Sequence, residues 1–305
     1  MDNIPDLALL SGQEQQTLLP GYLDAFTTLL ADPSKHTGLC ALQGLHHWQG
    51  RVSPDIIAAV MHNLCSEDPA MRQAAVGCLH LIKGEQCSRL ILQAIGDGHV
   101  RVRETGIDML RSVSNDYKEC ALGWISGNQA SLRAQQALLT SLLDAHLPGS
   151  VFEEIARSKS EEILLLQDAL TTLKNADRDT GNAARSLLQY TLKEQLDQTI
   201  ELVLLALESL YDRETIRIIH AGFSSGDSRH LANACEVLGN LDKGAVISNL
   251  SDALQQSAGG DFGGKGQFFA CADDVLRWCA DHGNNWINQC GKQALQSVTT
   301  GKTHA

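Results

Sequence analysis

Apolar and small side chains recur at helical spacing along most of the chain, and one stretch of this pattern occurs more than once. After Met71-Arg72, such side chains stand at positions 74, 75, 78, 79 and 82. This spacing places them on one face of an α-helix. The same order follows Val102-Arg103, 31 residues later, and a weaker copy begins 30 residues after that, at Leu132-Arg133. The pattern therefore predicts a series of related helices.

A second helix is expected after each copy. The segments 85–95 and 117–125 carry further apolar stripes, and turns containing glycine follow both of them. Pro54 and Pro69 fit the first turn of a helix. Side chains that can cap the free amides precede them, Ser53 in the first case and Ser66 or Asp68 in the second. A helical hairpin of about 30 residues cannot bury its own stripe, so neighbouring hairpins must stack. We expect an all-α chain of about 13 to 16 helices without a β-sheet.

The two clearest copies also resemble a known family. The run 68–72 with Ala75 and Leu79, and Val102-Arg103 with Gly106 and Leu110, resemble the HEAT-like repeat family, including the related bacterial repeats of bilin lyases. The resemblance implies a right-handed α-solenoid of HEAT-like helical hairpins. A fold of this kind says little about function.

The repeated arginine has two interpretations. Arg72, Arg103 and Arg133 occupy equivalent positions in the three copies. They form a binding stripe in one interpretation. In the other, which the resemblance favours, each arginine pairs with an acidic residue between repeats, such as Asp68 or Asp97.

A second resemblance covers about 40 residues. The segment Glu201–Leu241 is similar to the HEAT-like segment of some bacterial nucleotide-transporter-like membrane proteins. The membrane helices of those proteins have no counterpart here, so the resemblance implies no transport activity.

The same patterns suggest how the chain is divided. Residues 1–255 are predicted to form the solenoid, 256–266 a flexible Gly-rich loop, and 267–305 capping helices and a tail. Within the solenoid, a turn at 148–150 and a short stripe at 152–156 precede further helices at 161–173 and 183–196. The acidic side chains between 153 and 214 are mostly assigned to a solvated face.

Three motifs suggest sites, and each has a simpler structural explanation. The Gly-rich segment ends in Gly-Lys-Gly and follows a helix, whereas a P-loop follows a strand and ends in Gly-Lys-Ser/Thr. His46-His47-Trp48 places adjacent histidines in different directions, and Trp48 is expected to plug the space between hairpins. Cys279 and His282 have a spacing that suits a metal, but the chain lacks the Cys-x2-Cys pairs typical of zinc sites. We therefore predict no cofactor or metal.

Composition limits the partners and the compartment. The net charge of −12 and the pI near 5.3 argue against non-specific nucleic-acid binding. No apolar run is long enough to insert into a membrane, and the acidic start Met1–Asp6 lacks the basic segment of a signal peptide. The nine cysteines are scattered, mostly on apolar stripes, which favours the reducing cytoplasm. We expect Cys78, Cys120 and Cys235 to be buried and reduced.

These observations favour a non-enzymatic scaffold or adaptor that binds another protein on the concave face of the solenoid, where second helices lie. The candidate contact residues are Arg89, Gln93, Lys118, Glu119, Glu153 and Arg157, with Phe262 and Lys265 in the Gly-rich loop. The alternative is a HEAT-like enzyme, either a bilin lyase or isomerase or an alkylpurine DNA glycosylase. A glycosylase needs a basic, aromatic groove, which the acidic charge and the 5% aromatic content disfavour.

Overall fold

The structure is a computed structural model that describes residues 12–302, apart from 33, 115, 128–129, 144, 146, 177–182, 226, 242–243, 258–267 and 283–284. These residues contain fifteen α-helices and no β-strand, which confirms the all-α prediction. The chain divides into two compact units, Met1–Ser141 and Leu142–Ala305, here called unit 1 and unit 2. No helix in the described part of the chain combines the length and hydropathy needed to cross a bilayer.

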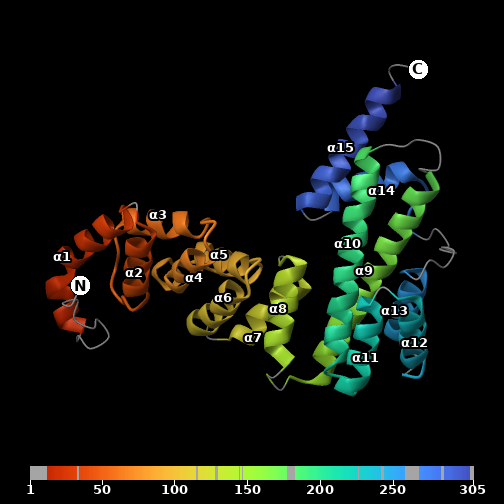
Figure 1. The fold of residues 1–305 in the computed structure, drawn as a ribbon, viewed down its shortest axis with the longest axis horizontal. Helices are drawn as coiled ribbons and strands as arrows, with labels where there is room; N and C mark the ends of the chain where they lie inside the picture. The colour runs from red at the N-terminus through yellow and green to blue at the C-terminus, as the bar shows by residue number, and fades with distance from the viewer. Residues whose placement is uncertain are drawn as a thin grey trace. The chain divides into compact units, whose positions relative to one another are not determined.

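Unit 1 is a succession of short helices after a longer first one (Figure 1). They are α1 (Gly12–Leu30), α2 (Lys35–His46), α3 (Pro54–Asn63), α4 (Pro69–Gly77), the 3₁₀ helix η2 (Leu79–Leu81), α5 (Glu85–Ile95), α6 (Val100–Val113), α7 (Tyr117–Ser126) and α8 (Leu132–Leu143). The last two residues of α8 fall beyond the boundary of the unit.

The first helices of the predicted hairpins pack against one another. Helix α4 contacts both α2 and α6, α3 packs on α4, and α5 packs on α6. The predicted stripe faces this packing, because Ala75, Cys78 and Leu79 are completely buried. Burial of apolar surface at about 25 cal/mol per Å² is the main force that holds such hairpins together.

The helix starts in unit 1 follow the predicted capping. The hydroxyl of Ser53 accepts a hydrogen bond from the N–H of Ile56 at 3.3 Å, before Pro54 begins α3. The carboxylate of Asp68 accepts from the N–H of Ala70 at 2.9 Å, at the start of α4. Each cap satisfies an amide that has no partner within its helix.

Helix α4 is shorter than the stripe predicts. It ends at Gly77, although the apolar spacing continues to Ile82, and η2 follows. The carbonyl of Gly77 accepts hydrogen bonds from His46 Nδ1 at 2.7 Å and His80 Nδ1 at 3.1 Å. These two imidazoles occupy the carbonyl that a continuing α-helix would use, so the chain tightens into a 3₁₀ turn.

Unit 2 contains two long helices and five shorter ones (Figure 1). They are α9 (Gly149–Ala176), α10 (Ala183–Leu207), α11 (Arg213–Ser224), α12 (Ser228–Gly239), α13 (Ala245–Ser257), α14 (Ala272–His282) and α15 (Asn285–Lys302). Helices α9 and α10 pack side by side; α13 and α14 pack on α9, and α15 packs on α10.

The long helices correct the predicted boundaries. The separate segments expected at 152–156 and 161–173 form the single helix α9, and the helix expected at 183–196 continues to Leu207 as α10. Neither glycine nor proline occurs between 150 and 176 or between 183 and 207, so the chain has no residue that would end either helix. The predicted division at 255 and 266 stays a prediction.

Candidate functional site

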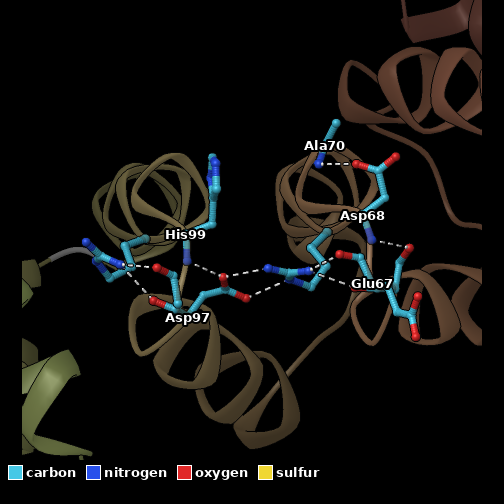
Figure 2. A network of polar contacts seen from close by, with 9 residues as sticks. Glu67, Asp68, Ala70, Asp97 and His99 are labelled. Carbon is cyan, nitrogen blue, oxygen red and sulfur yellow. Dashed lines mark hydrogen bonds and ion pairs between the residues drawn. The ribbon is translucent and has the colours of Figure 1, made fainter.

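A polar network joins equivalent turns of the sequence repeat in unit 1. Arg72, on α4, donates from Nε and Nη2 to the carboxylate of Asp97, at 2.8 and 2.9 Å, and Asp97 lies before the start of α6 (Figure 2). Nη1 of the same guanidinium donates to the carbonyls of Ser66 and Glu67, at 2.8 and 3.0 Å. One arginine therefore ties the turn before its own helix to the turn of the next hairpin.

The network repeats with the sequence period. Arg103 donates from Nη1 to the carbonyls of Asp97 and Gly98, at 2.9 and 3.0 Å. Arg103, Asp97 and Gly98 lie 31 positions after Arg72, Ser66 and Glu67, respectively. The two arginines therefore stabilise equivalent turns, and the repeat in the sequence corresponds to a repeat of hydrogen bonds.

The ion pair shifts both pKa values. The hydrogen bond from the guanidinium to Asp97 raises the pKa of Arg72. Burial acts most strongly on Asp97 and would raise its pKa, but hydrogen bonds from Arg72 and from the N–H of His99 outweigh it and lower the pKa. Both side chains are mostly buried, at 18% and 16% exposure. Arg72 thus pairs with Asp97 as predicted, and it serves the fold rather than an open binding stripe.

Four predicted contact residues lie on second helices of unit 1. Arg89 and Gln93 are exposed on α5, and their spacing of four residues places them on one face. The opposite face of α5 is buried through Cys87, Ile91, Ala94 and Ile95. On α7, Glu119 is exposed and Lys118 is partly buried. The outward face of α5 is therefore free to present its two polar side chains.

The other predicted contact residues differ in what the structure says of them. Glu153 and Arg157 are exposed on α9, in unit 2. Arg157 donates to Glu154 at 2.5 Å and lies 3.7 Å from Glu161, so its guanidinium is already paired. Phe262 and Lys265, with the whole Gly-rich motif, lie outside the described residues.

The turn at His46-His47-Trp48 is held partly by His80, a residue for which the sequence predicted no role. Trp48 is 1% exposed and packs edge-on against Phe26 of α1, with ring centroids 6.1 Å apart. His80 lies between two carbonyls, with Nε2 at 2.9 Å from Trp48 O and Nδ1 at 3.1 Å from Gly77 O. These contacts fix the loop between α2 and α3. His80 does not lie on the apolar stripe at 74, 75, 78, 79 and 82, so the pattern gave no signal for its role.

The cysteines are less buried than predicted. Cys78 is fully buried, its thiol donates to the carbonyl of Leu42 at 3.2 Å, and burial raises its pKa to about 12. Cys120 and Cys235 are only partly buried, so their predicted burial was wrong. In α12 the buried stripe runs through Leu231, Ala234 and Leu238, and Cys235 lies at its edge. All nine cysteines are free thiols.

One acidic residue of unit 2 is an exception to the solvated face predicted for most of them. Asp168 is only 6% exposed, and its Oδ2 accepts hydrogen bonds from the N–H groups of Phe268 and Phe269, at 2.9 and 3.0 Å. A carboxylate with these partners anchors the chain entering α14 to the middle of α9. Its partners are about a hundred residues away, so the local pattern gave no signal for the contact.

A second buried charge lies on the same helix. Lys159 is 4% exposed and donates to Glu162 at 3.0 Å, and Glu162 accepts from Gln195 of α10 at 3.1 Å. Buried charges need partners of this kind. The contacts from Lys159 through Glu162 to Gln195 link α9 to α10, which explains why charged residues are tolerated in this packing.

In the described part of the chain, no group of three or more His, Cys, Asp or Glu side chains is arranged to hold a metal ion. Cys279 is buried beside Cys290, and burial raises the pKa of its thiol to about 12. The side chain of His282 lies outside the described residues.

Comparison with known proteins adds no assignment. No protein-family model matches the chain, and no curated protein matches its sequence.

Proposed function

We propose that the protein is a non-enzymatic scaffold or adaptor of HEAT-like helical hairpins, which binds another protein through the outward face of its second helices. The hairpins would continue as a right-handed solenoid, and this face would be its concave side. The cytoplasm is the expected compartment, because the chain carries nine free thiols.

One observation carries the proposal. Helix α5 is divided into a buried face and a polar face, and Arg89 and Gln93 lie together on the polar face. The arginines that support the fold, Arg72 and Arg103, use their donors on turns and on Asp97. Arg89 is therefore better suited than those arginines to meet a partner, and arginine is enriched at the centres of protein interfaces.

The test compares two charge reversals on neighbouring helices. Arg89→Glu, alone and combined with Gln93→Glu, should reduce partner recovery at least about tenfold in a quantitative affinity purification. Arginines at the centre of an interface often contribute about 2 kcal/mol or more to binding. The matched control is Arg101→Glu, an exposed arginine on the first helix α6.

The control should recover the same partners as the unmodified protein, and all variants should keep the same melting temperature. Equal recovery by the α5 variants and the control would move the interface away from α5. A catalytic turnover measured with no bound protein would contradict the scaffold function itself.

A further inference from the structure

Cys40 and His36 lie one helical turn apart on α2. The thiol Sγ is 3.8 Å from the imidazole Nε2, and the spacing of four residues places both side chains on one face. Cys40 is partly exposed and His36 is exposed, so solvent reaches the pair. The thiol therefore has both a neighbouring base and access to small molecules.

The other eight cysteines lack this combination. Burial raises the pKa of the thiols of Cys78, Cys87 and Cys279. It also raises the pKa of the thiols of Cys120 and Cys235, which are less buried. Cys290 is 3% exposed. These six are poor nucleophiles, because the thiolate is the reactive form and reagents must reach it.

Two cysteines are exposed but have different surroundings. The thiol of Cys271 donates to the carboxylate of Asp274 at 3.4 Å, so the group beside it is an acid and not an imidazole. Cys65 is exposed, and no imidazole contacts its thiol among the contacts described for the chain. Cys65 is therefore an internal standard for an exposed thiol without a base.

We propose that Cys40 is a nucleophilic thiol, with His36 as its proton acceptor, and that it is a site of covalent modification by small soft electrophiles, including peroxides. The proton leaves Sγ for Nε2 of His36 as the thiolate attacks. With a peroxide, an S–O bond forms and the O–O bond breaks. The departing hydroxide takes the proton from His36 and becomes water, so sulfur is oxidised to a sulfenic acid while the peroxide is reduced.

The experiment measures the alkylation rate of each cysteine in the full-length native protein. Iodoacetamide is added at neutral pH in the presence of a chelator, and peptides are quantified by mass spectrometry over time. An ordinary thiol is only a few per cent ionised at pH 7, so Cys40 should react about tenfold faster than Cys65. Hydrogen peroxide with dimedone should trap sulfenic acid first at Cys40.

The variant His36→Gln should bring the Cys40 rate close to that of Cys65 and make it depend more steeply on pH. The matched control His220→Gln changes an exposed histidine on α11 and should leave the Cys40 rate unchanged. Circular dichroism verifies that both variants fold. Equal rates for Cys40 and Cys65 in the unmodified protein, or an unchanged Cys40 rate in His36→Gln, would overturn the proposal.

Discussion

Unit 1 buries its apolar residues mainly in short helices, whereas unit 2 adds two long helices, α9 and α10, to its shorter ones. From α2 to α8, the helices of unit 1 have 9 to 14 residues, whereas α9 and α10 of unit 2 have 28 and 25. Unit 1 contains a turn after almost every helix, such as the one at Gly84, where a φ of 74° suits only glycine. In unit 2, the long helices contain no such residue. The difference indicates that breaking residues, rather than hydrophobic content, determine where the helices of this chain end.

The polar contacts differ in the same way. In unit 1, Arg72 reaches Asp97, 25 residues away, in the next hairpin. In unit 2, Asn249 reaches Ser160 across 89 residues, and Asp168 binds backbone groups about a hundred residues away. Unit 1 is therefore built from neighbour contacts, as repeat proteins are, whereas unit 2 depends on segments that are distant in the sequence.

The largest effect is expected from a charge in the packed stripe of unit 1. Leu110→Asp places a carboxylate at a position that is 2% exposed and should cost about 3–5 kcal/mol. Hydrogen exchange should show loss of protection in α4 to α6. The control Val100→Asp changes an exposed residue of the same helix and should have little effect. An unchanged melting temperature for Leu110→Asp would mean that the stripe faces solvent.

The next prediction tests the continuity of α9. Glu161→Pro introduces proline near the middle of the long helix and should cost about 3 kcal/mol, because proline removes a helical hydrogen bond and clashes with the preceding turn. Ser150→Pro, in the first turn of α9, is the matched control and should be tolerated. Loss of amide protection should spread through unit 2 in Glu161→Pro. If both variants melt alike, 149–176 behaves as two helices, as the sequence suggested.

Much of unit 1 was predictable because its determinants are local. The caps Ser53 and Asp68, the prolines after them and the helix 85–95 all follow from neighbouring residues. The pairing of Arg72 with Asp97 was expected from the resemblance to HEAT-like repeats, whereas the constant period alone left a binding stripe equally open. The early end of α4 was missed because His46, 31 residues away, binds the carbonyl of Gly77.

Unit 2 was less predictable for the same physical reason. Two separate helical segments were expected within 149–176, yet no glycine or proline between 150 and 176 provides a break. The burial of Asp168 depends on backbone groups of Phe268 and Phe269, which local periodicity cannot indicate. Arg89 and Arg157 are both exposed, and exposure alone does not distinguish Arg89 from the paired Arg157.

A smaller and pH-dependent effect is expected at the link between hairpins. Asp97→Asn removes a charged acceptor of two guanidinium hydrogen bonds and should cost about 2 kcal/mol at neutral pH. The pKa of Asp97 in the folded protein lies below its ordinary value of 3.8. Its stabilisation is therefore complete above that value and is lost as the pH falls through the lower, folded pKa.

Unfolding in urea at pH 7 and at pH 3 should show this difference. The unmodified protein should lose more stability than Asp97→Asn on acidification, so the two should converge at low pH. Asp108→Asn is the control, because Asp108 and its partner Arg111 form an exposed ion pair. The side chain of Asp108 is 73% exposed and that of Arg111 is 44% exposed. A constant gap between the unmodified protein and Asp97→Asn at both pH values would show that the carboxylate charge does not stabilise the link.

The smallest effect is expected at the exposed ion pairs of α9. Arg157 donates to Glu154, and the hydrogen bond lowers the pKa of that carboxyl and raises the pKa of the guanidinium, but both groups are fully exposed. Water and salt screen such pairs, and ordering two long side chains offsets the attraction. Arg157→Ala should therefore leave the urea midpoint unchanged within error, at both low and high salt. At 1 M salt the electrostatic screening length is roughly three times shorter than at 0.1 M. A clear loss of stability that disappears at 1 M salt would mean that the surface of unit 2 relies on ion pairs in the way that unit 1 relies on Asp97.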